Sequence, residues 1–137
     1  MKLSKTSEYA IRILSFMAIS EKDLFSAKYL LEKINIPQKY MRRIMTELSK
    51  HNFITSVQGR DGGYFFSRDI KNIFLIDIID AVEDIKLYTG CVLGFHECSD
   101  KNPCAMHLNW VKTRDELVNT LTTTSLYDIK NNEVSKF

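Results

Sequence analysis

The sequence has no apolar run long enough to cross a bilayer, which needs about 20 consecutive apolar residues. Residues 1–6 lack the apolar stretch of a secretory signal, so we expect a cytoplasmic protein. Internal repeats, low-complexity segments, a nucleotide-binding glycine loop and a catalytic triad are also missing from the sequence. These absences argue against a membrane protein, a repeat protein and an enzyme.

Cysteine is scarce, and its placement is uneven. The chain has three cysteines, all between positions 91 and 104. An odd number in a protein expected to be cytoplasmic argues against a disulfide framework. Their clustering also argues against three unrelated core positions, and therefore indicates one shared site.

The net charge of +2 is small, but the two halves of the chain differ. Residues 1–70 contain 12 Lys or Arg and 7 Asp or Glu, a net of +5, whereas residues 71–137 contain 7 and 10, a net of −3. A length of 137 residues suits one small domain with an appendage. The basic half predicts a nucleic-acid-binding module attached to a different part.

Hydrophobic periodicity predicts helices over residues 7–20, 26–34, 37–51, 75–82 and 105–123. Ser26 is a good N-cap, and Pro37 breaks the chain and suits the first turn of a new helix. The expected apolar face of that third helix consists of Tyr40, Met41, Ile44, Met45 and Leu48. The two short helices with a tight turn between them predict a helix-turn-helix.

A β-hairpin is expected directly after the helix-turn-helix. Residues 53–57 and 64–67 have the pattern of strands, and residues 58–63 form a glycine-rich turn between them. A hairpin in this place is a wing. The predicted fold is therefore mainly α with a small β-hairpin, a winged helix-turn-helix followed by a long C-terminal helix.

The third predicted helix carries polar and basic residues opposite its apolar face. Its N-terminal half, from which base contacts in the major groove usually come, holds Gln38, Lys39, Arg42 and Arg43. Lys50 and Arg60 are better placed for phosphates, and Gln58 is the expected contact beside Arg60 in the wing. A merely solvated charged face is the alternative, but the turn, the basic face and the hairpin together favour DNA binding.

The cysteine segment has the pattern Cys91-x6-Cys98-x5-Cys104-x2-His107. Thiolates are soft ligands that select iron–sulfur clusters, zinc or copper(I). Zinc ribbons and fingers use closely paired Cys-x2-Cys knuckles, which this sequence lacks, and wider spacings suit a polyatomic cluster. Zinc and free redox-active thiols remain alternatives. His107, one helical turn after Cys104, is a further candidate ligand or a capping histidine.

Taken together, these motifs resemble one known family over residues 1–130. The matching segments are Met-Lys-Leu-Ser at the start with Tyr-Ala at 9–10, Ile-Pro-x2-Tyr-Met at 36–41, the wing at 57–64, the three cysteines, and Leu-Tyr-Asp-Ile at 126–129. This order and spacing are similar to the Rrf-two family of bacterial regulators. The resemblance implies a homodimeric transcriptional regulator, acting as a repressor on a palindromic operator in double-stranded DNA.

The family resemblance also implies a cofactor. It implies an iron–sulfur cluster, 2Fe–2S or 4Fe–4S, held by Cys91, Cys98 and Cys104 and responding to nitric oxide, redox state or iron supply. The fourth ligand varies: IscR-like members point to His107, whereas NsrR-like and RsrR-like members use an acidic residue of the partner's first helix, where Glu8 stands. IscR-like members lack an acidic residue at this position, so its presence here favours Glu8 as the fourth ligand. A metal-free, thiol-based or protein-partnered regulator like CymR is the alternative.

These expectations divide the chain into four parts. Residues 1–83 form the winged helix-turn-helix DNA-binding domain, and residues 84–104 the cysteine-containing cluster-binding loop. Residues 105–130 form the dimerisation helix and a short C-terminal segment, and residues 131–137 a disordered tail.

Overall fold

The computed structural model describes residues 2–132, and it is mainly helical with one antiparallel hairpin. The elements are α1 (Lys5–Ile19), α2 (Ala27–Lys33), α3 (Gln38–Lys50), β1 (Ile54–Val57), β2 (Gly63–Phe66), the 3₁₀ turn η1 (Ile70–Asn72), α4 (Leu75–Val82), α5 (Lys86–Thr89), α6 (His107–Thr123) and α7 (Leu126–Asn131). The predicted fold class is confirmed.

Polar side chains and one proline define where the first three helices begin. The hydroxyl of Ser4 accepts a hydrogen bond from the N–H of Ser7 at the start of α1, and Ser26 does the same for Tyr29 in α2. Pro37 precedes α3, and its carbonyl accepts the first helical bond, from the N–H of Met41.

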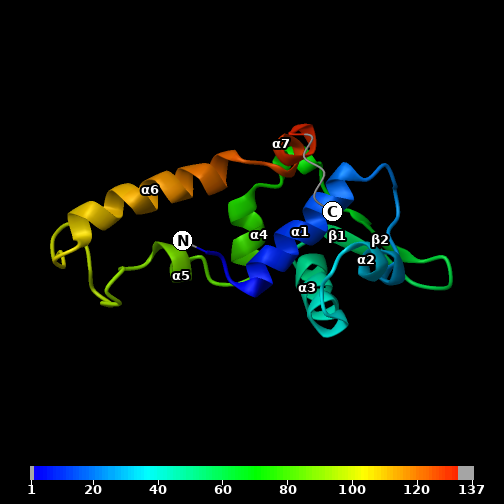
Figure 1. The fold of residues 1–137 in the computed structure, drawn as a ribbon, viewed down its shortest axis with the longest axis horizontal. Coiled ribbons are helices and arrows are strands. Elements are labelled where there is room, and N and C mark those ends of the chain that lie inside the picture. The colour runs from blue at the N-terminus through cyan, green and yellow to red at the C-terminus, as the bar shows by residue number, and fades with distance from the viewer. Residues whose placement is uncertain (1, 133–137) are drawn as a thin grey trace.

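Helix α1 is the centre of the core and packs against α3, α4 and α7 (Figure 1). Leu14 of α1, Leu30 of α2 and Leu48 of α3 are fully buried in the same cluster. Burying a leucine side chain contributes about 1.5–3 kcal/mol. The orientation of α3 is therefore fixed by apolar packing on its inner face.

The wing is tied to the chain just before α2. Ile54 pairs with Phe66 and Val57 with Gly63, and Tyr64 also exchanges two backbone hydrogen bonds with Phe25. A Cβ atom at Gly63 would lie 2.6 Å from the carbonyl oxygen of Phe25. This close backbone approach requires glycine.

Helix α6 extends from the main body like an arm, with α5 beside its middle and the cysteine segment near its far end (Figure 1). Along its length it packs against α4 and, more lightly, α5. Among the helices formed within residues 2–132, none combines the length and apolar character needed to cross a membrane.

The structure differs from the sequence-based expectations at α5, at Tyr40 and at the end of α7. Residues 84–104, expected to form the cysteine-containing loop, contain the short helix α5. Tyr40, expected on the buried face of α3, is 37% exposed, because the ring sits at the edge of the core against Tyr9. Asn131 ends α7 and Asn132 caps it, while residues 133–137 of the expected tail lie outside the described part of the chain.

Candidate nucleic-acid interface and metal centre

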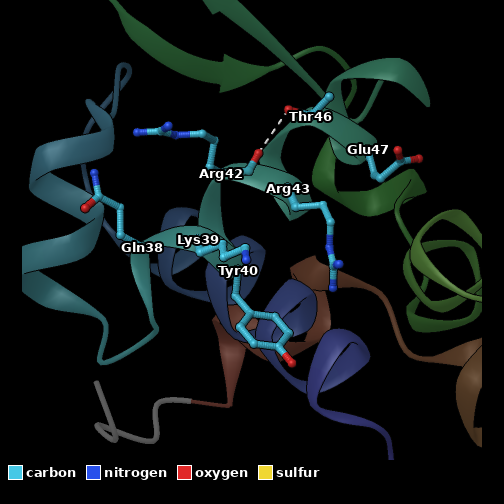
Figure 2. A pocket seen from close by; sticks show the side chains of 7 residues that line it. All are labelled: Gln38, Lys39, Tyr40, Arg42, Arg43, Thr46 and Glu47. Atoms are coloured by element: carbon cyan, nitrogen blue, oxygen red, sulfur yellow. Dashed lines mark hydrogen bonds between the residues drawn. The ribbon is translucent and has the colours of Figure 1, made fainter.

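Helix α3 presents a polar, cationic face to solvent. The four residues predicted for base contacts, Gln38, Lys39, Arg42 and Arg43, are all exposed. With Tyr40, Thr46 and Glu47 they line an open hollow of about 650 Å³ (Figure 2). The two arginine side chains leave the helix in different directions, so they can reach different groups of one bound ligand.

The C-terminal end of α3 is held in place by Arg68, a residue that the sequence patterns did not single out. Its Nη2 donates a hydrogen bond to the carbonyl of His51 at 2.6 Å, and its Nε donates to Asn52 at 3.1 Å. The guanidinium also lies 4.1 Å from the ring centroid of Phe53. A cation at the negative end of the helix dipole stabilises α3 and fixes its exit into β1.

Tyr40 joins the cationic face rather than the core. Its ring lies edge-on to Tyr9 of α1 with centroids 5.4 Å apart, and the guanidinium of Arg43 lies 5.4 Å from the Tyr40 centroid. This stacking restricts Arg43 and couples it to α1. A tyrosine next to an apolar stripe gives no sequence signal that distinguishes the rim of a core from its interior.

The remaining predicted DNA contacts also lie in solvent. Gln58 and Arg60 are exposed in the turn of the wing, where Gly59 adopts a φ of +106°. Lys50 is exposed at the end of α3 and forms an ion pair with Glu47 at 3.3 Å. Exposed pairs of this kind are weak, so Lys50 can exchange its partner for a phosphate.

The three cysteines are brought together at the far end of α6. Their sulfur atoms all lie within 4.8 Å of one another, and those of Cys91 and Cys104 are 3.7 Å apart. Gly94, with a φ of +82°, turns the segment back after Cys91. The indole N–H of Trp110 donates to the carbonyl of Gly90 at 2.7 Å, which ties the start of the loop to α6.

The surroundings of the sulfur atoms shift the pKa values of Cys91 and Cys98 in opposite directions. Burial opposes ionisation of Cys91, but hydrogen bonds from the backbone at Phe95 and Leu93, and from the other two thiols, lower its pKa to about 7. A backbone hydrogen bond from Cys104 favours the thiolate of Cys98, yet burial and the neighbouring thiols outweigh it and raise the Cys98 pKa. A thiolate is thus readily available at Cys91 near neutral pH.

His107 lies beside the cysteines, at the first turn of α6. It is 6% exposed, its Nδ1 is 3.3 Å from the sulfur of Cys98, and its Nε2 is 2.8 Å from the carboxylate of Asp100. The carboxylate favours a proton on Nε2, which leaves the Nδ1 lone pair directed toward the sulfur atoms. Asp100 carried no recognisable sequence signal, because it precedes His107 by seven residues across a turn.

Glu8 occupies a different place in the chain. It lies in the first turn of α1, and its carboxylate forms an ion pair with Lys5 at 3.2 Å. Within residues 2–132 the structure therefore brings His107, and not Glu8, to hydrogen-bond distance from a cysteine sulfur.

The fold and the sequence match one family along almost the whole chain. The family model for Rrf2, described as an iron-dependent transcriptional regulator, matches residues 3–132. The chain belongs to the Rrf2 family. Members of the family are DNA-binding transcriptional regulators, not enzymes, which agrees with the exposed face of α3 and the wing.

Individual relatives of this Rrf2-family chain cover nearly all of it. The transcriptional regulator IscR of Xenorhabdus nematophila is 28% identical over 136 residues, which span 98% of this chain and 82% of that protein. IscR of an Escherichia coli strain is 27% identical over 134 residues, spanning 97% and 82%. These similarities confirm the family resemblance seen in the sequence.

Solved structures of the Rrf2 family show the same fold. CymR of Bacillus subtilis, the global cysteine regulator, has a TM-score of 0.78 at 23% identity and covers 98% of this chain and 99% of its own. IscR of T. potens has a TM-score of 0.72 at 22% identity, covering 100% and 94%.

Proposed function

We propose that this chain is a cytoplasmic, homodimeric repressor whose binding to a palindromic operator is controlled by an iron–sulfur cluster at Cys91, Cys98 and Cys104. The observation that carries the proposal is the convergence of three sulfur atoms within 4.8 Å on the loop that follows a winged helix-turn-helix. Three soft donors in the same chain as a preformed winged helix-turn-helix suit a regulator that senses nitric oxide, redox state or iron supply.

The donor set fits such a cluster. The three thiols are half-buried, so they are accessible for assembly, and the Cys91 pKa of about 7 provides a thiolate at neutral pH. When bound, an iron–sulfur cluster supplies a centre that reacts with oxidants or nitric oxide and holds the three cysteines in one arrangement. The fourth ligand comes from His107 of the same chain or from the partner subunit's Glu8.

The two candidate fourth ligands have different support. His107 has its Nδ1 already 3.3 Å from Cys98 and its ring held by Asp100. Glu8 lies on α1 and requires a second subunit to approach the loop. A carboxylate is a harder ligand for iron than imidazole, so ligation by Glu8 favours a labile, switchable cluster. Comparison of Glu8→Ala with His107→Ala by visible and electron paramagnetic resonance spectra assigns the ligand.

Dimerisation is supported by the exposed apolar surface around the cysteines. Large hydrophobic residues are exposed in the segment from α5 to the start of α6, namely Leu87, Val92, Leu93, Phe95, Met106 and Leu108. Exposed large apolar side chains that concentrate in one segment are typical of protein interfaces. A second copy that covers it with its own α6 would place two α3 helices in successive major grooves, about 34–36 Å apart.

DNA binding in this proposal relies on solvent-exposed residues of α3 and the wing. Gln38, Lys39, Arg42 and Arg43 read base edges, while Lys50, Gln58 and Arg60 contact the backbone or the minor groove. A coupling of about 1–3 kcal/mol between the cysteine loop and α3 would change operator affinity roughly 5–150-fold.

A zinc site is the second candidate for the cysteine loop. The distance of 3.7 Å between the sulfur atoms of Cys91 and Cys104 is close to the ~3.8 Å separation of two thiolates on a tetrahedral zinc ion with bonds of about 2.3 Å. With His107 the loop offers a Cys₃His donor set. Zinc would give the loop a structural role and remove the redox response.

One preparation distinguishes these possibilities. Protein purified without oxygen is analysed for iron, acid-labile sulfide and zinc, and its visible spectrum is recorded before and after nitric oxide or oxygen. Iron with sulfide, and a chromophore that Cys98→Ala abolishes in a still folded protein, support the cluster. About one zinc per chain supports the structural site, and a colourless, metal-free protein supports regulation by free thiols.

A further inference from the structure

A hydrogen-bonded node joins the start of α1 to the segment that leads into the cysteine loop. The hydroxyl of Tyr88, in α5, accepts from the backbone N–H of Ser4 at 2.8 Å and donates to Oε2 of Glu83 at 2.8 Å. The hydroxyl of Ser7 donates to the same carboxylate oxygen at 2.5 Å. Two segments of the chain, the start of α1 and residues 83–88, therefore meet at this node although Ser7 and Glu83 are 76 positions apart in the sequence.

The hydrogen bonds of the node are short, and the node is at least partly shielded from water. Ser7 is fully buried, and Tyr88, Glu83 and Ser4 are half-buried. Burial alone would raise the pKa of Glu83, but hydrogen bonds from Ser4, Ser7 and Tyr88 lower it. Hydrogen bonds to an ionised carboxylate belong to the stronger class, and their geometry is correspondingly well defined.

The node lies between the two functional regions. On one side Tyr88 precedes Cys91 by three residues, so a rearrangement of the cysteine loop acts on its backbone directly. On the other side Glu83 borders a hollow of about 280 Å³ whose further walls include Arg43 and Glu47 of α3 and Thr6 of α1. Helix α1 also packs along α3, so a displacement at its first turn reaches the DNA-binding face.

We infer that the node formed by Ser7, Glu83 and Tyr88 transmits changes in the cysteine loop to the recognition helix α3. When the loop moves Tyr88, Glu83 loses one donor and the N–H of Ser4 loses its acceptor. The first turn of α1 then keeps only the hydrogen bond from Ser7 to Glu83 at this node, and the support of α3 changes with it. These three residues are positioning residues, and the inference rests on the proposed control of DNA binding by the cysteine loop.

The test perturbs the loop by chemistry that does not depend on any metal. The cysteines of the full-length, metal-free protein are alkylated with N-ethylmaleimide, and amide hydrogen exchange is measured by mass spectrometry for peptides that cover α1 and α3. In the unsubstituted protein we expect alkylation to accelerate exchange in α3 at least threefold. In Tyr88→Phe, which removes only the hydroxyl, we expect this acceleration to fall below 1.5-fold.

Matched variants separate transmission from general stability. Tyr127→Phe removes the hydroxyl of an exposed tyrosine on α7, and it should retain the full response. Ser7→Ala removes one donor to Glu83 while leaving Tyr88 intact, and it should at least halve the response to alkylation. This second variant keeps the inference testable if Tyr88→Phe folds poorly. Far-ultraviolet circular dichroism confirms that each variant is folded.

Any of three results would overturn the inference. They are unchanged amide exchange in α3 after alkylation of the unsubstituted protein, the full acceleration in Tyr88→Phe, and loss of the acceleration in Tyr127→Phe as well. Failure of the proposed function looks different. Protein without iron and sulfide, or DNA binding insensitive to Cys98→Ala, contradicts control by a cluster, while the response to alkylation is read independently.

Discussion

The proposed DNA-binding face of α3 and the cysteine loop are built in different ways. Helix α3 rests on buried residues such as Ile44 and Leu48, and its polar face is complete within a single chain. The cysteine loop contains little regular structure between α5 and α6, and it exposes Leu93 and Phe95 to solvent. Apolar packing positions the first region, whereas a few hydrogen bonds and one shared chemical site position the second.

This difference suits the proposed regulator, which would combine a fixed DNA-binding helix with a movable cysteine loop. A helix locked by a core keeps its contact residues in register with the groove. A loop held by local contacts opens at low cost in free energy, because little apolar surface must leave the core. The node around Glu83 lies where the two kinds of structure meet.

The largest contrast should appear in stability. Leu48→Ala leaves a cavity under α3 and should lower the free energy of unfolding by about 2–5 kcal/mol. Phe95→Ala, at a side chain that is 60% exposed, should change it by less than about 0.5 kcal/mol when the chain is monomeric. Urea unfolding followed by circular dichroism measures both. Equal losses would mean that the loop belongs to the core.

A pair of glycines tests the same contrast through the backbone. Gly63→Ala forces a Cβ against the carbonyl of Phe25 and should destabilise the wing by about 1–3 kcal/mol. Gly94→Ala meets open space, although its positive φ strains the turn, so its cost should remain within the cysteine loop. Thermal unfolding should therefore shift for Gly63→Ala alone. A larger shift for Gly94→Ala would contradict a separable loop.

Substitution of an α3 arginine should weaken DNA binding without changing the cysteine loop. Arg42→Ala should weaken binding by about 1–3 kcal/mol, roughly 5–150-fold, because a bidentate contact to a base is lost. Fluorescence anisotropy with a duplex enriched from a random pool by the unsubstituted protein measures the change. Lys112→Ala on α6 serves as the charge-matched control. Unchanged affinity of Arg42→Ala would place the reading face elsewhere.

The smallest predicted effect concerns acid stability at the junction of the two regions. Because the pKa of Glu83 is lower in the folded protein than its ordinary value of 4.5, ionised Glu83 stabilises the fold above that pH. This contribution is lost as the pH falls below about 4.5 and through the folded pKa. Glu83→Gln should flatten the acid side of the stability profile, measured by urea unfolding at several pH values. Glu97→Gln, which removes a carboxylate from the exposed cysteine loop, serves as the charge-matched control variant.

Much of the architecture could be predicted because its signals are local. Ser26 and Pro37 mark the starts of helices independently of tertiary packing, and the glycines at 62 and 63 indicate the turn of the wing. The exposure of Arg42 and Arg43 follows from their position opposite the apolar stripe. The short spacing of the cysteines likewise required them to meet on one loop.

Other features could not be predicted because they depend on residues that are distant in sequence. Tyr40 follows the apolar pattern of α3, yet only the position of α1 decides that its ring lies at the rim beside Arg43. Arg68 caps α3 from beyond the hairpin, 17 residues after His51. Asp100 orients His107 across a turn, and no periodicity relates the two residues.

The sequence alone determined the five longest helices and the hairpin, which face of α3 is charged, and that three thiols share one loop, because capping, periodicity and spacing act over a few residues. Only the tertiary structure decided that Ser7 and Tyr88, 81 positions apart, converge on Glu83, and that His107 rather than Glu8 lies beside a sulfur atom within the chain. Contacts of this kind depend on how whole helices pack, and packing is a property of the complete core.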